Sequence, residues 1–290
     1  MCSNRRVDTP LNLQRNWPSL APRSASRWPL VFAILCLLTG IGFLLLPGSI
    51  EGKALAALHG LCAQQPDHSF YFGDQRLPFD ARMTGIYGGF AVTALYLLAR
   101  GRWRRGNVPS ITVTALLASF ILVLGIDGVN STLRDIGLGY AYEPLNELRL
   151  ATGMLTGTTL AIFIWMMIAQ VGFAGRARVQ RSPVAGIADL GLLLAVEAVV
   201  AATILAGWSV LRLPLTFVLL LSAVAAVTGL TLAFVLLLGR REARAVATTD
   251  LAGPATVALL VALLLIGALG GGRFLLEWWL GIEPVVRSAA

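Results

Sequence analysis

The densest set of polar side chains in this chain lies at residues 59–87. The stretch contains both histidines, one of the three cysteines and several acids. Thiolate, imidazole and carboxylate groups bind zinc. The possible ligands here are Cys62, His59, His68 and Asp80. Because their separations follow no ligand-spacing rule, we predict that the stretch holds no metal and that the protein needs no cofactor. A mixed site built from these four residues is the alternative.

A second polar set could bind a ligand without thiols. It lies at the ends of predicted helices and consists of Arg82, Asp127, Asn130, Asn146 and Arg149. If these ends converge, one arginine would neutralise Asp127 and the other would be free to bind a small anionic or polar molecule. The alternative is a purely structural network, since buried ions near a membrane need partners in any case.

Glu197 lies among leucine, alanine and valine near the middle of a long apolar stretch. An ionised carboxylate is costly in such surroundings, so we expect it to be protonated or paired. A proton or cation role is the functional hypothesis, and a neutral, hydrogen-bonded acid is the alternative. Asp189, two turns earlier, is nearer the predicted cytoplasmic end, where the arginines at 176–181 could solvate it.

These residues belong to a chain that is too apolar to be a soluble globule, with 57% hydrophobic and 13% charged residues. A membrane-spanning helix needs about 20 mostly apolar residues. We therefore predict an all-α, polytopic membrane bundle of about seven transmembrane helices. They cover approximately residues 29–47, 83–99, 110–126, 150–173, 186–207, 213–239 and 251–271.

The arginines orient these helices. Fifteen of the 23 basic residues precede the first span or lie in every second connector. They are Arg5, Arg6, Arg15, Arg23 and Arg27, then Arg100, Arg102, Arg104 and Arg105, then Arg176, Arg178 and Arg181, then Arg240, Arg241 and Arg244. Basic connectors stay on the cytoplasmic side, which predicts a cell-membrane protein with a cytoplasmic N terminus and an external C terminus.

The net charge of +8 lies in these short connectors, where an anionic lipid leaflet explains it. We therefore predict the lipid bilayer as a partner and no nucleic acid. A membrane-protein partner is left open.

Composition divides the chain into a basic tail, a first membrane domain, a basic linker, an accessory three-span bundle and an external tail. Their ranges are 1–28, 29–174, 175–185, 186–272 and 273–290. Two outer connectors of the first domain, 48–82 and 127–149, are long and polar. The glycines at 270–272 are expected to end the last helix. Glycine pairs four residues apart, at 85 and 89, 153 and 157, and 267 and 271, predict close packing of helices within the chain.

Three stretches, in this order, resemble the domain of unknown function 2085 family of predicted prokaryotic membrane proteins. They are residues 59–87, with CAQQPDHSF and DARMTGIY, then IDGVNS at 126–131 and PLNELRLATGMLTG at 144–157. The family's first motif usually has a Cys-His pair and two later thiols, which would suit a metal or redox site. Here Cys62 remains, but Ala63, Asp80 and Met83 occupy the other positions. The resemblance, over about a third of the chain, implies a retained fold without that site.

We therefore predict a non-catalytic scaffold or accessory membrane protein with an outward-facing polar site. The first alternative is a small-solute or proton-coupled transporter that uses Glu197 and the external arginines. The second is a metal-dependent or redox membrane protein. The sequence contains no nucleotide-binding glycine loop, no His-Glu-x-x-His motif and no Gly-x-Ser-x-Gly elbow, and it therefore gives no positive indication of an enzyme.

Overall fold

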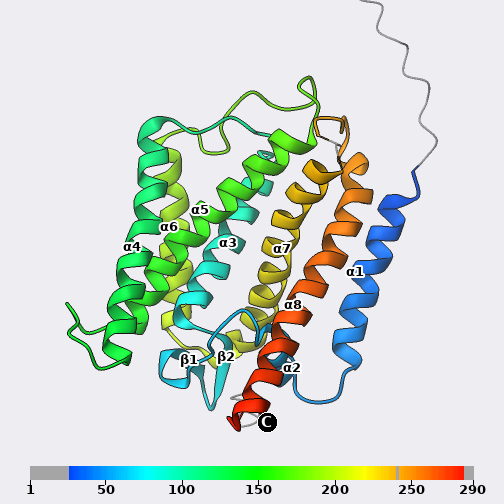
Figure 1. The fold of residues 1–290 in the computed structure, drawn as a ribbon. Coiled ribbons are helices and arrows are strands. Elements are labelled where there is room, and N and C mark those ends of the chain that lie inside the picture. Colours follow the sequence, from blue (N-terminus) through cyan, green and yellow to red (C-terminus); the bar gives the residue numbers. More distant parts are fainter. Residues whose placement is uncertain (1–25, 240–241, 284–290) are drawn as a thin grey trace, which may run out of the picture.

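The computed structural model describes residues 26–239 and 242–283, so most of the predicted basic tail, Arg240 and Arg241 lie outside the described residues. Long helices lie side by side in one bundle (Figure 1). They are α1 (Trp28–Leu45), α3 (Ala81–Ala99), α4 (Ile111–Asp135), α5 (Asn146–Gly172), α6 (Ile187–Leu205), α7 (Arg212–Leu238) and α8 (Ala252–Leu280). All except α3 are apolar enough to be among six candidate membrane spans. The all-α polytopic bundle is therefore confirmed.

The helix α3 is less apolar because it lies inside the bundle. It has 19 residues, about 28 Å of helix, and contacts α5, α6 and α7. Its buried residues include glycines, threonines and Tyr87 as well as Phe90. A helix covered by other helices does not need an apolar surface toward lipid, so its composition can serve packing instead.

Glycines bring α3 and α5 into backbone contact. A Cβ added at Gly85 would overlap the carbonyl oxygen of Leu150, and one added at Gly157 would overlap that of Ile86. Gly89 and Gly153 are equally close to the opposite backbone. Two of the three predicted glycine pairs therefore pack helices within the chain. The third does not, because a Cβ at Gly267 or Gly271 would meet nothing within 4 Å.

The expected end of the last helix at residues 270–272 is wrong, because α8 continues to Leu280. A close approach to the cap occurs in this part of α8, and it depends on Gly60 rather than on these three glycines. Gly60, just after α2 (Ile50–Leu58), lies so close to Gly270 that an added Cβ would overlap the Gly270 nitrogen. The first residues of the predicted external tail are therefore the last turns of α8.

Residues 49–80 form a cap over one end of the bundle (Figure 1). The cap consists of α2, the short helix η1 (Pro66–His68) and the antiparallel strands β1 (Ser69–Phe72) and β2 (Gln75–Asp80). The helix α2 buries Leu55 and Leu58. The hairpin was not expected from the sequence, although Gly73, with φ +65°, provides the left-handed conformation that its turn needs.

The arginine-bearing connectors lie together at the other end (Figure 1). The amide of Val179 donates to the carbonyl oxygen of Arg104 at 2.9 Å, and the amide of Ala174 donates to that of Ala245 at 2.8 Å. These bonds join the α3–α4, α5–α6 and α7–α8 connectors. The predicted division at 175–185 stays a prediction, but α7 shares one hydrophobic core with α3 and α5.

Candidate functional site

Arg82 and Asp127 form the ion pair that the sequence allows. Arg82, in the first turn of α3, donates through Nη2 to Asp127 Oδ2 at 2.7 Å and to the Ser131 hydroxyl at 3.0 Å. Asp127 is 1% exposed, and its Oδ1 accepts a hydrogen bond from the Tyr142 hydroxyl at 3.0 Å. Burial and this hydrogen bond raise the pKa of Tyr142, which keeps the phenol a donor. The pair therefore joins α3 to α4 and to the loop after α4.

Asn130 fixes the backbone of that loop. Its Oδ1 accepts hydrogen bonds from the amides of Ala141 at 2.8 Å and Tyr142 at 3.3 Å. Its Nδ2 donates to the carbonyl oxygen of Tyr142 at 2.8 Å. Both ends of the side-chain amide are thus used within the protein. This arrangement positions the Tyr142 ring against Asp127 rather than presenting an amide to a ligand.

Arg149 lies in the first turns of α5 and has different partners from Arg82. It donates through Nη1 to Asn146 Oδ1 at 2.8 Å and through Nη2 to the Nε2 of His68, in the cap, at 3.2 Å. Arg149 as a whole is 3% exposed, and its Nε has no hydrogen-bond partner. Among the described residues, no carboxylate lies within ion-pair distance of Arg149. Asn146 also donates to the carbonyl oxygen of Asp67 at 3.1 Å, which ties α5 to the cap.

His68 does not add a charge beside Arg149. Burial, and then the charge of Arg149, lower the pKa of His68, while Asp135, 3.6 Å from its Nε2, acts in the opposite direction. A neutral ring with its proton on Nδ1 can accept the Arg149 hydrogen bond at Nε2. The structure therefore brings the predicted polar residues to one end of the bundle, but in two groups, one around Arg82 and one around Arg149.

The four candidate metal ligands lie in three separate places. The Cys62 thiol donates to Asp80 Oδ2 at 3.2 Å, and Asp80 caps α3 by accepting the Met83 amide at 2.9 Å. His68 faces Arg149, and His59 lies against α8. No group of three potential ligands within metal-binding reach occurs in the part of the chain that the structure describes.

His59 has a partner that sequence reasoning missed. It is fully buried, its Nε2 lies 2.7 Å from Glu277 Oε2, and its ring stacks on Phe274 at 4.3 Å between centroids. Its Nδ1 lies 2.9 Å from the side-chain oxygen of Gln64. Gln64 uses its amide nitrogen for two backbone carbonyls, which fixes that orientation. His59 is therefore a link between the cap and α8.

Arg273 completes that link. It donates to Glu277 Oε1 at 2.8 Å and to the carbonyl oxygens of His59 at 2.8 Å, of Cys62, and of Ala63 at 3.0 Å. The four-residue spacing of Arg273 and Glu277 is a usual helical ion pair, and it was a signal that the helix continues beyond 272. Both residues lie in the predicted external tail, which does not take this spacing into account.

Glu197 is 3% exposed in the middle of α6. Its Oε1 accepts hydrogen bonds from the hydroxyl of Thr93 on α3, at 3.0 Å, and from that of Thr158 on α5. Its Oε2 has no hydrogen-bond partner. An apolar groove of about 350 Å³ between α5 and α6 is lined in part by this side chain. The threonines satisfy one oxygen of the carboxyl group and leave the other unsatisfied.

We expected the arginines at 176–181 to solvate Asp189, but its partners in the structure are other residues. It pairs with Nη1 of Arg102, from the α3–α4 connector, and accepts a hydrogen bond from the Tyr96 hydroxyl at 2.6 Å. It also accepts the Ala185 amide at 2.8 Å, which caps the start of α6. Arg102 was recognised in the sequence only as a topological signal, and its partner lies 87 residues away.

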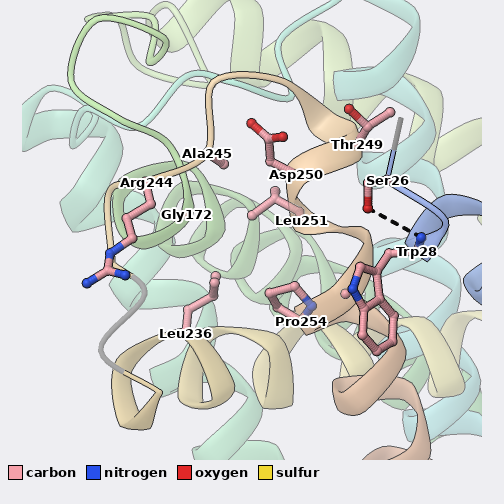
Figure 2. Close-up of a pocket in the computed structure, with 11 residues that line it drawn as sticks. Ser26, Trp28, Gly172, Leu236, Arg244, Ala245, Thr249, Asp250, Leu251 and Pro254 are labelled. Carbon is pink, nitrogen blue, oxygen red and sulfur yellow. Dashed lines mark hydrogen bonds between the residues drawn. The ribbon is translucent and has the colours of Figure 1, made fainter. Parts of the chain in front are cut away.

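Figure 2 shows a pocket of about 320 Å³ at the arginine-rich end. Trp28, Leu251 and Pro254 form an apolar wall, and the Arg244 side chain extends away from them on the opposite side. Asp250 lines the pocket, but its Oδ2 accepts the amides of residues 246 and 247 in the connector. None of the residues predicted to carry a site lines this pocket.

Comparison with known proteins supports the resemblance. The model of a family described as Predicted membrane protein (DUF2085) matches residues 62–163. No curated protein and no solved structure matches the chain. The matched segment includes Cys62 and both arginine groups at the capped end, whereas Glu197 and Glu277 lie beyond it. Residues 62–163 of this membrane protein are therefore similar in sequence to the DUF2085 family.

Proposed function

We propose that this protein is a non-catalytic scaffold or accessory protein of the cell membrane, with a site on its outer side that accepts an anionic or polar group at Arg149. The protein needs no cofactor in this role. Its N terminus is cytoplasmic and its C terminus external, so the outer cap faces away from the cytoplasm. In this proposal a membrane-protein partner supplies the acidic group.

The observation that carries this proposal is the unmatched charge of Arg149. A guanidinium that is 3% exposed normally has a carboxylate beside it, as Arg82 has in Asp127. Arg149 has only Asn146 and the neutral ring of His68 within hydrogen-bonding distance, and Asp127, Asp135 and Asp80 act on its charge without direct contact. A carboxylate or phosphate reaching it would supply the missing negative charge through charge-assisted hydrogen bonds.

The other polar groups at this end support a non-catalytic role. Asp127 and Asn130 are held by internal hydrogen bonds. Burial, and then the nearby charge of Asp80, raise the pKa of Cys62 to about 12. A thiol with so high a pKa is a poor nucleophile at neutral pH. Asp127 and Asn130 hold the loop after α4, and Cys62 contacts Asp80 within the cap, which leaves Arg149 as the charged group without a carboxylate in contact.

Anion-dependent stability tests the site. The purified full-length protein is heated in detergent with sodium acetate, sodium phosphate or sodium chloride at one ionic strength. We expect a saturable rise of the melting temperature with acetate or phosphate, and loss of that rise in Arg149→Gln. Arg134→Gln is the matched control, because Arg134 is partly exposed and already paired with Glu143 at 2.5 Å. Equal responses of wild type and Arg149→Gln would refute the site.

Orientation has its own test. A reporter fused after Ala290 should be active outside the cytoplasm, because seven helices, the six candidate spans and α3, then cross the membrane between the two ends. A reporter found in the cytosol would show that the number of spans or their polarity is wrong. In that case the proposed outer site would face the cytoplasm.

A proton-coupled or small-solute transporter is the second candidate, and Glu197 favours it. An acid buried inside a candidate span without a cationic partner is a common feature of proton pathways. Proton flux into vesicles containing the purified protein is compared with that of Glu197→Gln. A flux that the substitution abolishes supports transport, and the absence of flux in wild type eliminates this candidate.

A further inference from the structure

Only one of the two carboxyl oxygens of Glu197 has hydrogen-bond partners. Both threonine hydroxyls, from Thr93 and Thr158, donate to the same oxygen, Oε1. The other oxygen is buried and has no partner among the described residues. No basic side chain pairs with Glu197 anywhere in the described ranges. A buried carboxylate without a cation is strongly disfavoured, so the arrangement fits a neutral acid.

A neutral carboxylic acid has one carbonyl oxygen and one hydroxyl. The carbonyl oxygen accepts hydrogen bonds, which is the role of Oε1 between the two threonines. The hydroxyl is then Oε2, and it is a donor without an acceptor. What the site lacks is therefore an acceptor oxygen, not a cation.

A groove of about 350 Å³ lies next to this group. Besides Glu197, its lining is apolar and comes from α5 and α6 only. It is open because four of the lining residues are alanines, Ala151, Ala198, Ala201 and Ala202, whose side chains leave room that leucines would fill. On α6 the lining runs from Leu194, one turn before Glu197, to Leu205, the last residue of the helix, so the groove extends from the acid toward the capped end of the bundle.

We propose that this groove is a binding site for an uncharged lipophilic molecule with one hydroxyl or carbonyl oxygen, which accepts a hydrogen bond from Glu197. The groove lies between two candidate membrane spans, where such molecules are dissolved. Its volume is at the lower end of the range for small-ligand sites. A charged ligand does not fit, because its charge would be buried against a neutral acid and apolar walls. The site is independent of the outer arginine and of any transport activity.

Photolabelling tests the site directly. The full-length protein in nanodiscs is irradiated with a long-chain alcohol that carries a diazirine, and in parallel with the matching diazirine alkane. We expect the alcohol to label α5 and α6 about two- to tenfold more than the alkane, the ratio that corresponds to one hydrogen bond. Ala201→Phe, which fills the groove, should remove the labelling of these helices by both probes. Glu197→Met should remove the preference for the alcohol but keep the labelling.

Other outcomes overturn the proposal. Equal labelling of wild type by alcohol and alkane would mean that the groove holds only hydrocarbon chains. A diazirine-bearing amine that labels more strongly than the alcohol would mean that the acid is ionised. If Glu197→Met does not elute as a folded species, infrared difference spectra with 1-decanol replace it. A carboxylic-acid C=O band must then shift with decanol in wild type and be missing in Glu197→Gln, and a wild-type spectrum without such a shift refutes the site.

Discussion

The helices α5 and α6 both pack on α3, but they are attached in different ways (Figure 1). Between α3 and α5, glycines such as Gly85 and Gly157 bring the two backbones together. Between α3 and α6, the contacts are acids: Asp189 with Tyr96 and Arg102, and Glu197 with Thr93. The α3–α5 contact depends on glycines, which have no side chain, whereas α6 is attached by hydrogen bonds and an ion pair to its acids.

This difference explains where the groove lies. A glycine contact is continuous and leaves no space between helices, because each backbone fills the surface of the other. An acid reaches across a gap and fixes a helix at one point. With two such points, about two helical turns apart, α6 stays close to α3 while the alanine-rich surface between α5 and α6 remains open.

The largest effect should come from filling the glycine contact. Gly157→Leu introduces a side chain where even a Cβ overlaps the α3 backbone. Because backbone cannot move aside as a side chain does, we expect a loss of about 3 kcal/mol or more, or no folded protein. Unfolding in detergent and elution on a sizing column measure the loss.

Gly267→Leu is the matched control for that substitution. It places leucine in another candidate span at a glycine whose added Cβ meets nothing within 4 Å. Leucine there should be neutral or slightly stabilising, since glycine is a poor helix former. Similar losses in both variants would show that the α3–α5 glycines are not a tight contact.

The next largest effect concerns the acid at the basic end of α6. Arg102→Met leaves Asp189 largely buried without its cation, and we expect a loss of about 2–4 kcal/mol. Asp189→Leu combined with Arg102→Met should recover much of this loss, because no unpaired charge remains. A double-mutant cycle on the free energy of unfolding measures the coupling. Losses that simply add would contradict a direct pair.

The sequence was a good guide to this fold and a partial one to its contacts. Long apolar stretches predicted the helices because lipid imposes both their length and their composition. Glycine spacing predicted close packing, but it did not distinguish the pairs on α3 and α5 from Gly267 and Gly271, because spacing does not show which face meets a neighbour. The hairpin of the cap was missed, since its strands are short and Pro78 interrupts the second.

Among the candidate residues, the sequence could predict Arg82 with Asp127 because both lie at the same end of predicted spans. The predicted end of the third span at residue 126 is wrong, because α4 continues to Asp135 and places Asp127 about two turns before its end. It could not predict His59 with Glu277 or Arg102 with Asp189, since these partners are 218 and 87 residues apart. The pattern of residues along the chain does not show which helix ends, distant in the sequence, lie next to each other in space. The charge that most needs a partner, Arg149, is likewise visible only once its neighbours are known.

A smaller effect is expected at the other attachment of α6. Thr93→Val and Thr158→Val each remove one hydrogen bond to Glu197 and leave the other, so each should cost about 1 kcal/mol. The double variant should cost more than the sum, because it leaves the buried carboxyl group with no described donor. Thr203→Val is the control, since Thr203 bonds only to the backbone of its own helix. Additive losses would show that the two threonines do not act on one oxygen.

The smallest effect concerns the cap, which is attached to the start of α3 by neither glycine nor a buried ion pair. The thiol of Cys62 donates to Asp80, the residue that caps α3. Burial first, and the charge of Asp80 second, raise the pKa of this thiol to about 12. In the unfolded chain a thiol has a pKa of about 8.5. The folded state therefore favours the protonated form, which contributes its full stability below about pH 8.5 and loses it as pH rises toward 12.

Two measurements test this direction of the pH dependence. In a Cys2→Ser, Cys36→Ala background, N-ethylmaleimide at pH 8 should modify Cys62 slowly in the folded protein and rapidly after unfolding in SDS. The stability difference between this background and the same chain with Cys62→Ala should be constant from pH 6 to pH 8 and shrink above that, because alanine does not ionise. Rapid modification of the folded protein would mean that the thiol is exposed and that the cap does not hold it against Asp80. A stability difference that grows with pH would mean that the folded state favours the Cys62 thiolate, which is the opposite of the expected effect.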